Sequence, residues 1–114
     1  MNDSHYFLPH QRCRAYALAL ELLAAVRAAH ITDPKLRDQG LRAAKSACLN
    51  IAEASGRGSR ADRARVLMIA RGEAGEACAA VEIATQSGEA RAQALPRVIA
   101  AGGRLVAMLT KRAR

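Results

Sequence analysis

A five-residue segment, Ser55-Gly56-Arg57-Gly58-Ser59, separates two long apolar segments and constrains the fold more than any other part of the sequence. Gly56 suits the left-handed backbone conformation that often ends a helix. Ser59 suits the N-cap of a following helix, and Asp62 stands three residues later, as in a capping box. So short a connection forces two helices to lie side by side and antiparallel. The alternative, a phosphate-binding loop, lacks the Lys-Ser/Thr ending and the preceding strand of that motif.

Apolar residues recur every three or four positions along four segments, which is the spacing of one face of a helix. We expect helices over residues 11–29, 34–55 and 60–86, and a fourth that ends near residue 111. Asp33 is the expected N-cap of the second helix, and Gly40 is expected where a neighbouring helix packs closely. Pro96 leaves open whether residues 88–94 are helical. The sequence therefore predicts an all-α, up-down antiparallel four-helix bundle over residues 11–114, preceded by a flexible arm over residues 1–10.

The two middle helices are apolar on more than one side, since Val66 begins an unbroken apolar run that ends at Ala70. A four-helix bundle covers each helix on one side only, so such residues predict contact with another subunit. A core made mostly of alanine, in a chain with 3% aromatic residues, also favours stabilisation by subunit contacts. The alternative is a helix at the centre of a single core. We predict a homo-oligomer whose interface contains Cys48, Leu49, Val66, Met68 and Ile69.

Polar residues inside the second helix predict a structural network. Asn50 and Glu53 stand one turn apart, and Arg57 follows Glu53 by four residues in the order that favours an ion pair. Buried polar groups need partners, so we expect Asn50, Glu53, Arg57 and Arg71 to contact one another. The alternative role for Glu53, a general base, lacks a second titratable residue nearby in the sequence.

The net charge of +8 is large for 114 residues and favours polyanions or acidic partners. Arginines crowd the start of the third helix, where the helix dipole prefers anions, so we expect an intersubunit ion pair or a bound anion to compensate. Aromatic residues for base stacking are few, which predicts weakly sequence-specific, salt-dependent binding. A solvated charged surface, or a scaffold that binds an acidic protein, is the alternative. The candidate RNA- or DNA-binding residues are Arg57, Arg60, Arg63, Arg65, Arg71, Arg42 and Lys45.

Catalytic and metal-binding patterns are missing from the sequence. No nucleophile stands at a spacing that predicts a neighbouring base, and His5, His10 and Cys13 fit no common zinc pattern. Three widely spaced cysteines suit reduced thiols, and charged residues interrupt every long apolar run. We therefore expect a cytoplasmic protein that is not an enzyme, with no cofactor, no metal and no membrane contact.

The middle of the chain carries the pattern Arg-Ala-Ala-x-Ser-x-x-x-Asn-Ile-Ala-Glu, followed by Gly-Arg, Ser, Ile-Ala-Arg-Gly and Glu. This pattern resembles the four-helix-bundle proteins encoded in intervening sequences of large-subunit ribosomal RNA genes, a family similar to the accessory variability protein of diversity-generating retroelements. The resemblance implies an up-down bundle, a ring-like homopentamer and no catalysis. It also implies a basic surface that engages nucleic acid and a polymerase partner in the retroelement relatives. The matching positions are Arg42, Ala43, Ala44, Ser46, Asn50, Ile51, Ala52, Glu53, Gly56, Arg57, Ser59, Ile69, Ala70, Arg71, Gly72 and Glu76.

Overall fold

The computed structural model describes residues 7–114, which contain four α-helices, two short 3-10 helices and no strand. The α-helices are α1 (Arg14–Ala28), α2 (Pro34–Ser55), α3 (Arg60–Gln86) and α4 (Leu95–Arg112). The 3-10 helices η2 (Pro9–Arg12) and η3 (Ala92–Ala94) precede α1 and α4. The predicted all-α class and the four predicted helices are confirmed.

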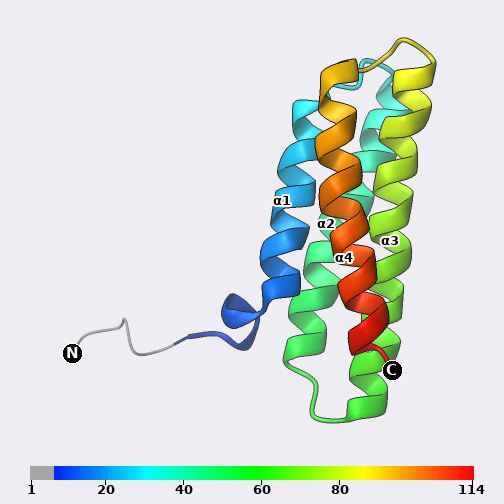
Figure 1. Ribbon diagram of the computed structural model, residues 1–114. Helices are drawn as coiled ribbons and strands as arrows, with labels where there is room; N and C mark the ends of the chain where they lie inside the picture. Colours follow the sequence, from blue (N-terminus) through cyan, green and yellow to red (C-terminus); the bar gives the residue numbers. More distant parts are fainter. Residues whose placement is uncertain (1–6) are drawn as a thin grey trace.

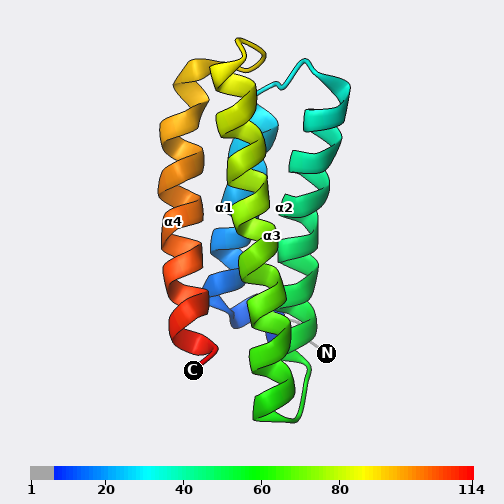
Figure 2. The same cartoon turned by 90° about the vertical axis from the view of Figure 1, so that its right-hand side faces the viewer.

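The helices run alternately up and down, and each lies beside its neighbour in the chain (Figure 1). Helix α4 also packs against α1, which closes the bundle. The α1–α2 and α3–α4 connections lie at one end, and the α2–α3 turn lies at the other end with the C-terminus (Figures 1 and 2). Backbone hydrogen bonds join the first two connections, because Thr32 N donates to Glu89 O and Arg91 N donates to Ala29 O.

Alanine fills most of the core, as the composition predicts. The largest side chains with less than 2% exposure are few, and they come from all four helices. Small residues let the helices approach closely at two glycines. A Cβ added at Gly40 of α2 would lie 3.2 Å from Ala80 Cβ of α3, and one added at Gly102 of α4 would overlap Cys78 Sγ. The large buried residues are Leu22, Ile51, Val81, Val98, Leu105 and Leu109.

Two of the predicted helix caps are confirmed. Asp33 Oδ2 accepts a hydrogen bond from Leu36 N at 2.9 Å, and Ser59 Oγ accepts one from Asp62 N at 3.3 Å. The left-handed conformation predicted for Gly56 is wrong, because its φ of −92° and ψ of −3° continue the right-handed helical region. Positive φ values occur instead in the connections at the opposite end, at His30 (48°) and Gly88 (72°).

The structure also defines where the predicted arm ends and where the last helix begins. Pro9 and His10 belong to η2 rather than to an extended arm, while residues 1–6, with His5, lie outside the described residues. Residues 88–91 form a turn that leads into η3, so part of the range 88–94 is a 3-10 helix, and Pro96 stands in the first turn of α4. The bundle proper therefore begins at Arg14 and ends at Arg112.

Candidate nucleic-acid interface

Three separate segments of the chain gather positive charge at one end of the bundle. Residues 12–14 before and at the start of α1, residues 53–65 around the α2–α3 turn, and residues 111–114 at the end of α4 lie together there (Figure 1). A hollow of about 240 Å³ between them is lined by Cys13, Ser55, Arg63 and Arg112, among others. We call these three segments the basic end. They hold nine lysines and arginines and two acidic side chains. Their net charge is therefore +7, compared with +8 for the whole chain.

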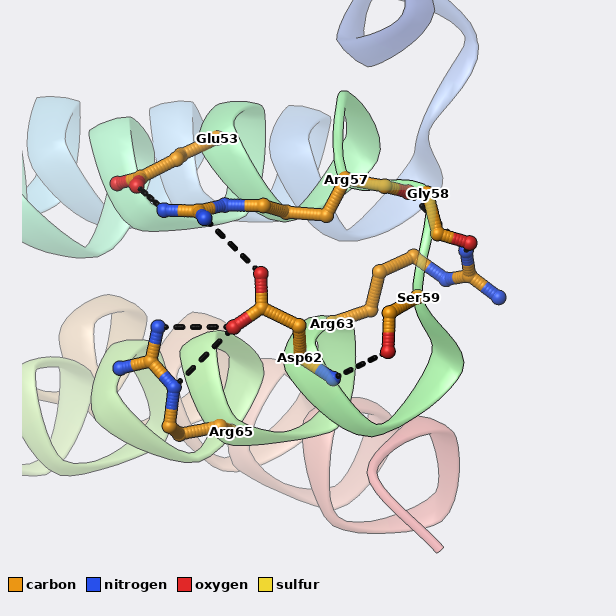
Figure 3. Close-up of polar contacts among 7 residues, drawn as sticks. All are labelled: Glu53, Arg57, Gly58, Ser59, Asp62, Arg63 and Arg65. Atoms are coloured by element: carbon orange, nitrogen blue, oxygen red, sulfur yellow. Dashed lines mark hydrogen bonds and ion pairs between the residues drawn. The ribbon is translucent and has the colours of Figure 1, made fainter.

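Arg57 and Asp62 form the centre of a polar network at the turn (Figure 3). Arg57 pairs with Glu53 through one guanidinium nitrogen, and its Nη1 lies 2.9 Å from Asp62 Oδ2. The second carboxylate oxygen, Asp62 Oδ1, accepts hydrogen bonds from Arg65 Nη2 at 2.9 Å and from Arg65 Nε at 3.3 Å. The hydrogen bond from Arg65 lowers the pKa of Asp62, and the hydrogen bond to Glu53 raises the pKa of Arg57.

Arg63 stabilises the turn in a different way, through the backbone. Its Nη1 donates to Arg57 O and to Gly58 O, both at 3.1 Å. These carbonyls follow the C-terminal end of α2, where the helix dipole favours a cation. Arg63 and Arg65 therefore find partners within the chain, whereas Arg60 takes part in no ion pair among the described residues, and the bound anion or second subunit expected here stays a prediction.

The predicted polar network is correct for one pair and wrong in its other members. Glu53 contacts Arg57, but Asn50 donates to Ser46 O and Ser46 Oγ one turn earlier in α2. Arg71 points to α4, where its Nε donates to Thr110 Oγ1 at 2.7 Å. Asp62 belongs to the network in place of Asn50 and Arg71. Its position three residues before Arg65 is the spacing from which this contact could have been predicted. The network is also not buried, since its side chains are between 30% and 60% exposed.

The seven predicted nucleic-acid-binding residues do not form one surface. Arg57, Arg63 and Arg65 lie at the turn with Arg60, which is exposed. Arg71 lies against α4, and the exposed Arg42 and Lys45 lie farther along α2, beside a hollow of about 500 Å³. The sequence reasoning missed the arginines and lysines that α1 and α4 bring to the turn. They could have been predicted from the up-down helix order, because this order places the start of α1, the turn and the end of α4 together. The missed residues are Arg12, Arg14, Lys111, Arg112 and Arg114.

The family model of the 23S rRNA-intervening sequence proteins matches residues 11–111. The chain belongs to this family. The match extends the resemblance of the central segment over all four helices. The search of curated proteins finds no match. The family description names no reaction and no ligand, and the likeness to the retroelement accessory protein stays a prediction.

In this intervening-sequence protein, the predicted interface residues divide into two groups. Cys48 and Val66 are 6% and 2% exposed, because both point into the core of their own bundle. They are therefore not available to a partner, which corrects the predicted interface. Leu49, Met68 and Ile69 are 71%, 47% and 44% exposed, so these three residues remain candidates for contact with another subunit.

The remaining titratable residues form no obvious reactive centre in the part of the chain that the structure describes. Residues 7–114 contain no group of three or more His, Cys, Asp or Glu residues placed to hold a metal ion. Glu53 is half-exposed and paired with Arg57. Burial raises the pKa of the Cys48 and Cys78 thiols, and Cys13 Sγ accepts a hydrogen bond from Arg112 at 3.6 Å. Among the described helices, none has the length and apolar character needed to cross a membrane.

Proposed function

We propose that this protein is a non-enzymatic, oligomeric accessory protein that binds RNA or DNA phosphates through its basic end. The observation that carries the proposal is the concentration of positive charge, which is seven in excess at the basic end of a chain whose net charge is +8. A surface of this kind attracts a polyanion over several ångströms and releases condensed counterions when it binds. Free thiols suit the reducing cytoplasm as the place where it acts.

Geometry supports phosphate contact at the basic end more than at the rest of the surface. Seven of its basic residues are exposed, and Arg60 takes part in no ion pair among the described residues. The Asp62 carboxylate holds Arg65 in place without covering it, since the Arg65 side chain is 60% exposed. Its Nε and Nη2 are engaged by Asp62, so Nη1 is the guanidinium nitrogen left to contact a phosphate. The exposed residues are Arg12, Arg14, Arg60, Arg65, Lys111, Arg112 and Arg114.

The same surface gives little means of reading a base sequence. Tyr16, two residues beyond Arg14, is half-buried and packs edge-on against His10 with ring centroids 4.8 Å apart, and the Arg12 guanidinium already stacks on the Phe7 ring at 4.5 Å. Sequence-specific recognition of single strands depends on stacking and on hydrogen bonds to base edges. We therefore infer binding through the backbone, with little discrimination between sequences.

Assembly would strengthen this binding. Leu49, Met68 and Ile69 are exposed on α2 and α3, and the resemblance to the pentameric relatives implies five copies. Copies joined by such contacts present several basic ends to one strand. Weak phosphate contacts then add through effective concentration.

A salt titration tests the proposal. Fluorescence anisotropy with random-sequence 20-nucleotide RNA and DNA, at salt from about 50 to 300 mM, gives the slope of log K against log salt. We expect tight binding at low salt and a slope of about −0.7 for each phosphate contact on a single strand. Polyglutamate labelled in the same way serves as the acidic-polymer control. Absence of nucleic-acid binding at 50 mM salt, with binding to polyglutamate retained, would reject the proposal in favour of an acidic protein partner.

A further inference from the structure

Helices α2 and α3 each carry a second row of residues at heptad spacing, outside the rows that form the core. The spacing alternates between three and four residues, as in the seam of a coiled coil. The outer α3 row mixes small, apolar and charged residues, and Ile69 and Ile83 in it are 44% and 52% exposed. We call these the outer α2 row, which is Lys35, Gln39, Arg42, Ser46, Leu49 and Glu53, and the outer α3 row, which is Arg65, Ile69, Gly72, Glu76, Ala79 and Ile83.

Contacts between the two helices place both rows on one face of the bundle. The turn network connects Glu53, the last residue of the outer α2 row, through Arg57 and Asp62 to Arg65, the first residue of the outer α3 row (Figure 3). Figure 2 shows α2 and α3 as neighbouring helices, and the two are in contact. The two rows therefore run antiparallel along the same outward face.

The close contacts also set which residues of the two rows lie level with one another. Gly40 lies beside Ala80, and Arg57 lies beside Asp62. Because the helices are antiparallel, Leu49 is level with Ile69 and Gly72, and Arg42 is level with the stretch from Glu76 to Ala79. The bundle thus presents an exposed cation on α2 and an exposed anion on α3 at nearly the same level.

Neither of these charges is paired with another charge within residues 7–114. The ion pairs of residues 7–114 do not include Arg42 or Glu76, and both side chains are exposed. Leu49, at 71%, is the most exposed of the large apolar side chains in this part of the chain. Level with it, Gly72 leaves open space, since an added Cβ would meet no atom within 4 Å. Charge and shape on the α2 half of the face therefore complement the α3 half.

We propose that this face binds a second copy of the chain, with the outer α2 row of one copy lying antiparallel along the outer α3 row of the next. Arg42 pairs with Glu76 of the second copy, and Leu49 fills the space at Gly72 of the second copy beside Ile69. This inference depends on the homo-oligomer of the proposed function but not on nucleic-acid binding. Opposite charges placed at one level, together with exposed apolar residues, identify a copy of the chain as the occupant.

The direction of the contact has a consequence for the whole assembly. A rotation axis parallel to the bundle keeps the levels of the two copies aligned, whether it closes a dimer or a larger ring. Every basic end then lies on the same side of the assembly. Arg42 takes part in the subunit contact, so it is not available to bind phosphate. Lys45 does not belong to the outer α2 row and stays available.

Charge reversal at the paired positions tests the contact. Light scattering coupled to gel filtration, at about 20 μM protein and low salt, gives the mass of wild type, Arg42→Glu, Glu76→Arg and the double variant. We expect each single variant to have the mass of one chain or, where some oligomer remains, an association constant at least tenfold lower than that of wild type. The double variant should regain the wild-type mass. Arg97→Glu on α4 and Glu82→Arg on α3 make the same charge changes away from the rows and should assemble normally. Circular dichroism checks that each variant is folded.

The outcomes separate this inference from the proposed function. Single reversals that keep the wild-type mass would overturn the Arg42–Glu76 contact while leaving the oligomer in place. A wild-type protein that is a single chain at 20 μM would overturn both the contact and the oligomer. Random-sequence RNA binding, measured on the same samples, should weaken in the single variants through the loss of avidity but stay measurable, because the basic end of each chain is unchanged. A Leu49→Asp variant should also fall to one chain, and normal assembly of this variant would contradict the docking of Leu49 at Gly72.

Discussion

Asp62 ties α3 to the turn that precedes it, because its Oδ2 lies 2.9 Å from Arg57 Nη1. The other oxygen of the same carboxylate holds Arg65, one turn farther along α3. A single acidic side chain therefore fixes two of the arginines of the basic end. It also lowers the positive charge that these arginines present to a polyanion, so its removal should change both the stability of the turn and the binding of phosphate.

Asp62→Asn should strengthen nucleic-acid binding and weaken the turn. Loss of the carboxylate charge frees Arg57 and Arg65 to contact phosphate, so affinity at about 100 mM salt should rise and the salt slope should steepen. The melting temperature should fall slightly, since the pairs are exposed and such pairs contribute little. Fluorescence anisotropy and thermal unfolding measure the two effects.

Glu21→Gln is the matched control for this variant. It also removes one negative charge, together with the single ion pair of Glu21 with Arg104 at 3.6 Å, but lies midway along α1. It should change nucleic-acid affinity less than Asp62→Asn does. Equal gains in affinity from the two variants would show that net charge, and not the arginines at the turn, controls binding.

Acid should loosen the turn through the same carboxylate. Asp62 has a lowered pKa in the folded protein, chiefly because Arg65 donates to it. Its stabilising contribution is complete above the pKa of an unfolded aspartate, about 3.9, and is lost as the pH falls through the lower folded value. The difference in melting temperature between wild type and Asp62→Asn should therefore be constant near neutral pH and shrink towards zero as the pH falls below the pKa of an unfolded aspartate. A difference that grows on acidification would contradict this prediction.

Gly102 and Gly103 should respond oppositely to alanine. A Cβ at Gly102 overlaps Cys78 Sγ, so Gly102→Ala should destabilise the bundle by about 1–3 kcal/mol. A Cβ at Gly103 meets nothing within 4 Å, so Gly103→Ala should be neutral or stabilise by up to about 1 kcal/mol. Urea unfolding measures both changes. Cys78→Ala should relieve much of the cost of Gly102→Ala, and purely additive effects would contradict the contact.

Alkylation should distinguish the folded thiols from unfolded ones. Burial raises the pKa of Cys48 and of Cys78, and the negative charge of Glu82 raises that of Cys78 further. A raised pKa leaves less thiolate at pH 8, and the thiolate is the reactive form. Mass spectrometry should find both cysteines modified by iodoacetamide more slowly in buffer than in guanidinium chloride. Equal rates in the two solvents would show that neither thiol is protected by the fold.

The helices could be predicted because local signals agree with the packing. Asp33 before Pro34 and Ser59 after the glycine-containing turn mark two helix starts, and the apolar spacing marks the faces that meet in the core. Gly40 lies where close packing was expected, against Ala80 of α3. The same spacing did not separate Leu49 from Cys48, although adjacent residues point about 100° apart on a helix. One of these two residues is exposed and the other is buried.

The polar contacts could be predicted only in part. Glu53 and Arg57 stand four residues apart, so their pairing follows from local geometry. The partner of Arg71 is Thr110 of α4, 39 residues later, and no spacing rule reaches that far. The basic end depends in the same way on the assembled bundle, because α1 and α4 bring their charges to the turn only when all four helices pack together.

The position of the charge, rather than its total, is the central claim, and two double variants of equal net charge test it. Arg60→Gln with Arg114→Gln removes two positive charges from the basic end, and Arg91→Gln with Arg97→Gln removes two from the opposite end of the bundle. Binding to one random-sequence RNA is measured for both over the same range of salt. We predict that the first variant loses affinity and that its salt slope becomes shallower by about 1.4, while the second stays close to wild type. Equal losses in the two variants would contradict the assignment of nucleic-acid binding to the basic end.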